Sequence, residues 1–230
     1  MKRSELNKAI RECIELVEAR GLSFPGFAKW TPEDWEKIDE DQREIVDNML
    51  GWDVSDFGGN FAKTGLLIFT FRNGNFNNKE TYPKPYAEKL LWVADGQTLP
   101  FHFHWSKMED IINRGGGDLE ITVYNSLEDG EFDKESDVHL TMDGKKVVVP
   151  AGGTILLKPG MSVTLCPGQY HQWIGVPGTG AVMLFEVSTT NDDTVDNRFH
   201  SAKSRIPEIE EDEPAEYLIF NDYKNYVHLK

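Results

Sequence analysis

Residues 96–116, GQTLPFHFHWSKMEDIINRGG, are the stretch that decides the fold and the chemistry of this chain. His102 and His104 are separated by one residue, and Glu109 follows five residues after the second histidine. Because alternate side chains of a β-strand point to the same face, an extended segment here places both imidazoles on one side. A short turn after His104 would bring Glu109 back to that side from the next strand. Two imidazoles and a carboxylate form most of a site for a divalent metal ion.

The missing ligand of such a site is expected to be His171. It lies in residues 165–171, LCPGQYH, where a Pro-Gly pair predicts a turn that leads into a strand. The chain has six histidines, and three of them fall in these two motifs. A lone buried histidine is more often a hydrogen-bonded core residue than a ligand. The spacing of the first motif, however, favours a metal site.

The two motifs resemble those of the cupin superfamily. The pattern of residues 96–116, G-x5-H-x-H-x4-E-x6-G, fits the first cupin motif at every spaced position. The second motif is met more loosely, because Pro167 and Gly168 are adjacent and Gly175 stands where the family usually has asparagine. In cupins, three histidines and one glutamate bind a divalent metal inside a small β-barrel. The resemblance therefore implies the ligand set His102, His104, Glu109 and His171.

A more specific resemblance, to the D-lyxose isomerase family, covers nearly the whole chain. Two of the runs that carry it are specific, because general cupins lack them. The resemblance implies a metal-dependent aldose–ketose isomerase that interconverts D-lyxose and D-xylulose, with some activity between D-mannose and D-fructose. The two specific runs are HFHWSKMEDIINRGGG (102–117) and EVSTTNDDTVDNRF (186–199), and the others are GWDVSDFG (51–58), GLLIFTFRNGN (65–75) and EDEPAEYLIFNDY (211–223).

Composition limits the classes of partner. The 230 residues carry a formal net charge of −15, which argues against nucleic acid and anionic membranes, since both attract clustered Lys and Arg. Cys13 and Cys166 are too few for a disulfide framework. No run reaches the roughly 18 apolar residues of a membrane span. The charged N-terminal segment does not read as a signal peptide. We therefore expect a cytoplasmic protein.

Helical patterns come first along the chain, and strand patterns follow. Residues 4–20 predict an amphipathic helix capped by Ser4, and residues 31–50 predict a second helix that starts at a Thr-Pro pair. Short strands separated by turn residues are typical of a barrel or sandwich. We predict a mainly β protein: a cupin-type β-barrel (double-stranded β-helix or jelly roll) with a C-terminal tail at 58–230, and an N-terminal helical extension at 1–57 that packs on the barrel. The two parts form a single domain overall. The expected strands are 65–71, 86–94, 118–126, 138–142, 145–150, 154–157, 162–166 and 181–188.

The expected ligands suit Mn²⁺, with Co²⁺, Fe²⁺, Ni²⁺ and Zn²⁺ as alternatives. Ligands alone do not separate an isomerase from a dioxygenase or decarboxylase, because two open metal positions accept either two sugar oxygens or O₂. Glu186 favours the isomerase. It lies in residues 182–188, VMLFEVS, an otherwise apolar run in which a carboxylate is costly unless it is paired or functional. A base there would move the C2 proton to C1 through a cis-enediolate; the alternative is a structural ion pair.

Three further polar residues are candidates for the site. Lys107 lies in the turn between two expected ligands, where a cation would stabilise a substrate oxygen or move a proton. A solvent-facing loop lysine is the alternative. In view of the resemblance, Asp196 and Arg198 are expected to bind sugar hydroxyls, although a polar turn explains them equally well.

Other functions remain open at this point. The chain fits another cupin enzyme, either a dioxygenase or an isomerase of phosphorylated hexoses, and the negative charge weighs slightly against the latter. A non-catalytic sugar-binding cupin is the third reading, although it has no need of a base at Glu186. The expected partner is a small sugar, and cupins of this kind are often homodimers.

Overall fold

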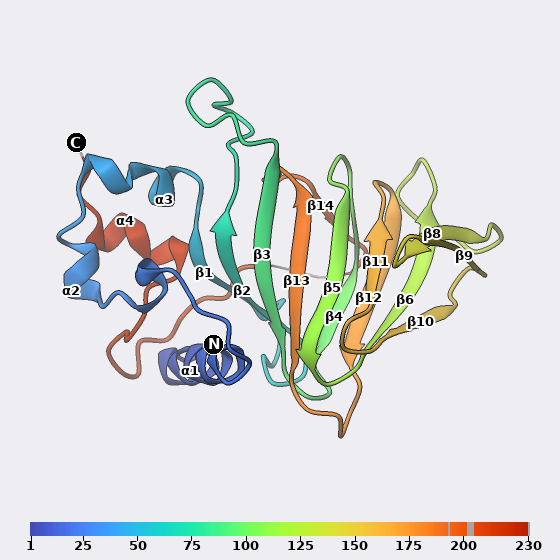
Figure 1. Cartoon of the computed structure of the whole chain (residues 1–230), viewed down its shortest axis with the longest axis horizontal. Helices are drawn as coiled ribbons and strands as arrows, with labels where there is room; N and C mark the ends of the chain where they lie inside the picture. The colour runs from blue at the N-terminus through green and yellow to red at the C-terminus, as the bar shows by residue number, and fades with distance from the viewer. Residues whose placement is uncertain (193, 202–204, 230) are drawn as a thin grey trace.

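Two curled antiparallel β-sheets and a set of short helices make up the protein in this computed structural model, which describes residues 1–192, 194–201 and 205–229. Figure 1 shows the strands arranged across the molecule, with the helices, α1 (Arg3–Glu18) among them, gathered at one end. The predicted mainly β, cupin-type architecture with a helix at its N-terminal end is confirmed. No helix in the described ranges is long and apolar enough to cross a membrane.

The larger sheet has eight strands, and every pairing in it is antiparallel. Most of the predicted strands occur within one or two residues of their expected limits. The sheet order is β1 (Gly51–Ser55), β2 (Leu66–Arg72), β3 (Tyr86–Val93), β13 (Val182–Thr189), β5 (Glu109–Gly116), β11 (Ser162–Leu165), β8 (Val138–Met142) and β9 (Lys145–Val149).

The smaller sheet packs its inner face against the larger one. Apolar side chains from both sheets form one buried core, which includes Leu91, Leu184, Ile121 and Trp173. The sheet order is β10 (Thr154–Leu157), β6 (Leu119–Ser126), β12 (Gln169–Gly175), β4 (Thr98–His104) and β14 (Asn197–Phe199), with β7 (Phe132–Asp133) paired to β6.

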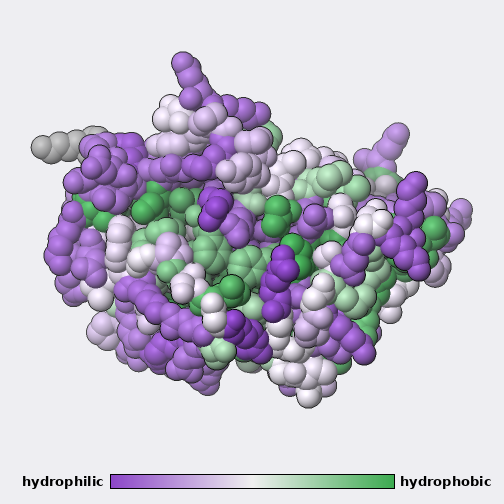
Figure 2. Space-filling view, viewed as in Figure 1, coloured by the Kyte–Doolittle hydropathy of each residue, from purple (hydrophilic) through white to green (hydrophobic). Residues whose placement is uncertain are grey.

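The outer face of the larger sheet is covered in part by α1. The apolar stripe of the helix, with Leu6, Ile10 and Cys13, packs on Phe69 and Trp92 in a second buried cluster. Figure 2, in the same view as Figure 1, shows hydrophobic residues gathered in the middle of this face within a hydrophilic rim. Both cysteines are free thiols, as their number suggested.

Two details of the predicted first helix and of the start of the sheet were wrong. Ser4 does not cap α1, because its hydroxyl donates to Asp212 Oδ2 at 2.7 Å and the helix already starts at Arg3. The sheet begins at Gly51 rather than after residue 58, because β1 is wholly buried and pairs along its length with β2.

The continuous helix predicted at 31–50 was also wrong. Its start at Thr31 is confirmed, but a new cap at Asp39 interrupts it. The Asp39 carboxylate accepts from Asp41 N at 2.9 Å, and Gln42 Oε1 accepts from Asp39 N at 2.9 Å. Aspartate competes in this way with helix continuation. The segment forms α2 (Pro32–Trp35), η2 (Glu40–Gln42) and α3 (Arg43–Asp47), while η1 (Gly26–Lys29) precedes it and η3 (Phe220–Asp222) and α4 (Tyr223–Tyr226) lie near the C-terminus.

Candidate active site

Three histidines meet on the inner faces of two neighbouring strands. His102 and His104 point inward from β4, and His171 stands opposite His102 on β12. Phe103, between the two β4 histidines, points outward and packs on Tyr170 with ring centroids 4.8 Å apart. One ring nitrogen from each histidine lies within 4.8 Å of the others, and all three residues are buried.

Glu109 reaches the histidines from the other sheet. It is the first residue of β5, after the turn that follows β4. Its Oε1 lies 3.2 Å from His104 Nε2 and 3.3 Å from His171 Nε2. The fold therefore brings together the four side chains that the two sequence motifs singled out.

The hydrogen bonds of these side chains fit a bound cation. Nδ1 of His171 lies 3.0 Å from the carbonyl oxygen of Gln169, so the ring proton is assigned to Nδ1 and a lone pair to Nε2. His102 makes the same kind of contact to Pro100 at 3.0 Å. The lone pair of His171 therefore faces a carboxylate oxygen of Glu109, and neither atom has a hydrogen-bond partner among the described residues. Two buried acceptors in contact are unfavourable unless a cation lies between them, so this donor set fits a divalent metal.

The protonation states also suit a metal. Burial lowers the pKa of His102 well below its usual value and the pKa of His171 to about 4, so both rings are neutral near pH 7. Burial opposes ionisation of Glu109, but the Lys107 ammonium and His104 outweigh it and hold the pKa of that carboxyl well below its usual range. Neutral imidazoles and a carboxylate are the forms that bind metal.

Glu186 lies beside this group, on β13. It is buried, and three donors converge on its Oε1: Ser188 Oγ at 2.9 Å, Lys107 Nζ at 3.1 Å and Lys89 Nζ at 3.4 Å. Lys89 stands directly opposite Glu186 on β3. The Glu186 carboxylate is therefore held in place between two buried ammonium groups, next to the expected metal ligands.

Lys107 connects Glu186 with the expected metal ligands. Its Nζ lies 2.6 Å from Glu109 Oε2, in addition to its contact with Glu186. The turn that carries it is held by Asp196, whose carboxylate accepts from Ser106 N at 2.9 Å, Ser106 Oγ at 2.7 Å and Lys107 N at 3.0 Å. Asp196 therefore supports the position of Lys107, and its oxygens are directed to the turn.

The predicted sugar contact from Arg198 lies on the other side of the sheet. Arg198 pairs with the outward-facing Phe103, and its guanidinium lies near Gly130, outside the barrel. Its neighbours Asn197 and Phe199 point inward instead, opposite His104 and His102. Neighbouring residues of a strand point to opposite faces. The polar segment that contains Arg198 therefore contributes Asn197 and Phe199 to the site, two residues that the sequence did not single out.

Three of the expected ligands, His102, His104 and Glu109, line one cavity together with Lys107 and Glu186; its volume is about 420 Å³ when the space open to solvent is included. Its other walls are mainly apolar, with Ile68, Leu91, Leu99 and Trp173 among them, and the further polar lining groups are Ser55, Asn197 and Arg205. An apolar cavity with a few convergent polar groups is the usual form of a small-molecule site.

A model of the D-lyxose isomerase family matches residues 1–223 of this chain. The chain belongs to that family. It is 41% identical over 228 residues to the D-lyxose/D-mannose isomerase of Escherichia coli O157:H7, covering 98% of this chain and 100% of the relative. It is also 41% identical over 230 residues to the enzyme of the same name from Serratia proteamaculans, covering 99% and 100%. The chain is thus a sugar isomerase.

Solved structures agree at the level of fold. The L-ribose isomerase of Cellulomonas parahominis, without ligand, superposes with a TM-score of 0.58 at 16% identity, over 91% of this chain and 98% of that one. At this identity the likeness shows only that this member of the D-lyxose isomerase family shares the cupin-like barrel of those isomerases.

Two charged residues near the expected ligands escaped the sequence reasoning: Lys89, which contacts Glu186, and Arg205, which lines the cavity. Lys89 could have been predicted, because it is a charged residue in an otherwise apolar strand, as Glu186 is, and it lies on the same face as the buried Leu91. Arg205 had none, since it lies outside any strand or helix near the C-terminal tail. Only the packing of that tail brings it to the cavity.

Proposed function

We propose that this sugar isomerase interconverts D-lyxose and D-xylulose, and less efficiently D-mannose and D-fructose, with the help of a divalent metal. The observation that carries the proposal is Glu186, a buried carboxylate clamped by two lysines in the same cavity as three of the four expected ligands. The names of the relatives support the choice of sugars.

The metal would be held by His102, His104, Glu109 and His171. Mn²⁺ is the first choice for three imidazoles and a carboxylate, with Co²⁺, Fe²⁺, Ni²⁺ and Zn²⁺ as alternatives. When bound, it supplies a Lewis acid that polarises the substrate carbonyl and stabilises negative charge on the neighbouring oxygens.

The protein's own groups move the proton. Glu186 removes the C2 proton of the open-chain aldose to give a cis-enediolate and returns that proton to C1, while the hydroxyl proton of O2 passes to O1, which completes the ketose. Among the described residues, every contact to its carboxylate is made at Oε1, so Oε2 is the oxygen that takes the proton. Lys107 stabilises the charge that develops on the substrate oxygens, and Asp196 holds Lys107 in place.

Replacing the base tests this role. Glu186→Gln keeps the shape of the side chain but cannot accept a proton, so turnover of D-lyxose should fall at least ~10²-fold. Metal content should be unchanged, because Glu186 is not one of the four ligands. Glu120→Gln, at an exposed position of β6, is the matched control and should behave as wild type. Near wild-type turnover in Glu186→Gln would rule out the proposed base.

Substrate and metal are tested together on chelator-treated protein. Ketose formation should return when Mn²⁺ is added, and should be faster with D-lyxose than with D-mannose or mannose 6-phosphate. Oxygen consumption with Fe²⁺ would indicate a dioxygenase instead. Tight binding of metal and sugar without turnover would indicate a non-catalytic cupin. Light scattering at several concentrations tests the proposed homodimer.

A further inference from the structure

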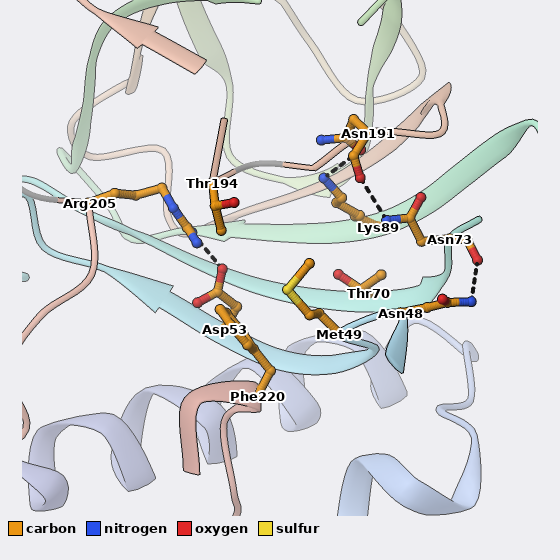
Figure 3. Close-up of a pocket in the computed structure, with 10 residues that line it drawn as sticks. All are labelled: Asn48, Met49, Asp53, Thr70, Asn73, Lys89, Asn191, Thr194, Arg205 and Phe220. Atoms are coloured by element: carbon orange, nitrogen blue, oxygen red, sulfur yellow. Dashed lines mark hydrogen bonds and ion pairs between the residues drawn. The ribbon is translucent and has the colours of Figure 1, made fainter. Parts of the chain in front are cut away.

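A second polar pocket adjoins the metal-ligand cavity. Its volume is about 350 Å³ when the space open to solvent is included, and Asp53, Thr70, Lys89, Asn73 and Arg205 are among its lining residues. Figure 3 shows Arg205 facing Asp53 on one side of this pocket, with Lys89 and Asn191 on the other. Arg205 also lines the metal-ligand cavity, so its guanidinium stands where the two spaces meet.

The Arg205 side chain is fixed by the sheet. Its Nη1 donates to Asp53 Oδ2 at 2.6 Å and to Ser55 Oγ at 3.4 Å. Asp53 is held in turn, because its Oδ1 accepts from Val54 N at 2.8 Å. The two side chains are only 12% and 9% exposed, so the ion pair is largely shielded from solvent.

Asp53 and the expected ligand Glu109 lie on different strands of the larger sheet. Asp53 and Ser55 belong to β1, the edge strand of the larger sheet, whereas Glu109 belongs to β5. Strands β2, β3 and β13 separate the two, and Glu186 lies on the last of these. Arg205 nevertheless lines the same cavity as Glu186 and three of the expected ligands, so it is available to the far hydroxyls of a sugar whose carbonyl end is at Glu186.

The charges around the cavity suit hydroxyls better than a phosphate. Three ammonium or guanidinium groups line the two pockets in the described part of the chain, and each is ion-paired: Lys107 with Glu109, Lys89 with Glu186, and Arg205 with Asp53. A sugar phosphate carries about two negative charges at neutral pH, and these would meet already compensated cations and three carboxylates. A hydroxyl both donates and accepts, so it can bind to a guanidinium and a carboxylate side by side.

We propose that the Arg205–Asp53 pair determines the substrate class by binding the terminal hydroxyls of an unphosphorylated sugar and rejecting sugar phosphates. This inference rests on the proposed isomerase function. Arg205 binds the hydroxyls of the sugar, Asp53 disfavours the charged phosphate group, and neither residue takes part in the proton transfer at C2.

The test uses two substitutions with different expected effects. Arg205→Met removes the donors but keeps much of the length, so KM for D-lyxose should rise about tenfold or more, while kcat changes less than about threefold. Asp53→Asn removes the opposing charge, so the ratio of kcat/KM for mannose 6-phosphate to that for D-mannose should rise at least ~10-fold. Arg114→Met, at an exposed position of β5, is the control.

If Arg205 and Asp53 were only structural, their replacement would lower kcat as well as affinity. It would leave the ratio of kcat/KM for mannose 6-phosphate to that for D-mannose unchanged. The inference would be overturned if KM for D-lyxose is unchanged in Arg205→Met and the ratio of kcat/KM for mannose 6-phosphate to that for D-mannose is unchanged in Asp53→Asn. Turnover of D-lyxose by the wild-type protein in the same assay would still support the proposed isomerase. Should Arg205→Met fail to fold, Arg205→Lys keeps the charge and is expected to show a smaller rise in KM.

A binding measurement separates this inference from the proposed activity. D-Arabinitol, the reduced form of D-lyxose, cannot be isomerised, and its dissociation constant can be measured by calorimetry. Arg205→Met should weaken its binding about tenfold or more relative to wild type and Arg114→Met. Equal binding by all three proteins would overturn the role of Arg205, whether or not the wild-type protein turns over D-lyxose.

Discussion

His171 illustrates how single residues are prepared for metal by burial. Its imidazole is 1% exposed, and desolvation lowers its pKa from 6.5 to about 4. The neutral ring is the form that the fold accommodates, and its Nδ1 contact to Gln169 directs Nε2 inward. The same burial makes the metal-free site sensitive to acid, because the unfolded chain protonates this histidine more easily than the folded protein does.

Metal-free protein should therefore lose stability as the pH falls from about 6.5 toward 4. In that window the unfolded state binds a proton at residue 171 that the folded state does not, so the free energy of unfolding decreases by up to about 3 kcal/mol. Below that window Glu109 acts in the same direction, because its folded pKa is also depressed. Urea unfolding of chelator-treated protein at pH 7, 6, 5 and 4.5 measures this slope.

His171→Gln is the matched variant for the acid experiment. Glutamine does not titrate, so its unfolding free energy should fall less steeply between pH 6.5 and about 4 than that of the wild type. Parallel slopes for the two proteins would show that other groups carry the acid sensitivity.

At the scale of elements, α1 is joined to the barrel by its apolar stripe. Leu6, Ile10 and Cys13 are fully buried against the outer face of the larger sheet. Cys13 reports on this contact, because burial raises the pKa of its thiol far above the usual range. Only opening of the helix lets the thiol ionise and react.

Loosening the helix should expose this thiol. In a Cys166→Ser background, Leu6→Ala leaves a cavity under α1 that costs about 2–5 kcal/mol, so alkylation of Cys13 should be at least ~30-fold faster. Glu15→Ala, on the exposed side of the same helix, should leave the rate unchanged. Equal rates in the two variants would mean that α1 does not open independently of the barrel.

At the scale of the whole molecule, the two ends of the chain are held together by Arg3. Its guanidinium binds Glu211 through Nε at 2.8 Å and Asp222 through Nη1 at 2.9 Å, although more than 200 residues separate them in sequence. The ion pair with Asp222 is largely buried, with the two side chains 2% and 12% exposed, whereas Glu211 closes the clamp from the surface. The segment that carries Arg205 leads into this anchored tail, which helps to place the guanidinium at the cavity.

Arg3→Met should destabilise the protein by about 3–5 kcal/mol, because Asp222 is left as an uncompensated buried charge. Thermal unfolding, followed by circular dichroism, measures the loss. Arg11→Met on the same helix is the control: its ion pair with Glu216 is about half exposed, and its loss should cost no more than about 1 kcal/mol. Adding Asp222→Asn to Arg3→Met should recover part of the loss, and a further additive loss would contradict the proposed clamp.

Local sequence was sufficient wherever periodicity and spacing carry the information. The alternation around His102 and His104, the turn to Glu109 and the apolar run around Glu186 predicted strands and inward-facing side chains, because a strand has only two faces. The continuous helix predicted at 31–50 does not form because two caps, at Thr31 and Asp39, lie within one helical pattern.

What the sequence by itself determined is the barrel, its N-terminal helix and the four candidate ligands, since motifs and short-range patterns specify them. Only the tertiary structure decided which further groups reach the cavity. Lys89 became the partner of Glu186 through strand pairing, and Asp196 became a support for Lys107. Arg198 was directed outward by register, and Arg205 was brought in by the folding of the tail. Contacts between residues far apart in the chain depend on how sheets curl and pair, and no local pattern encodes them.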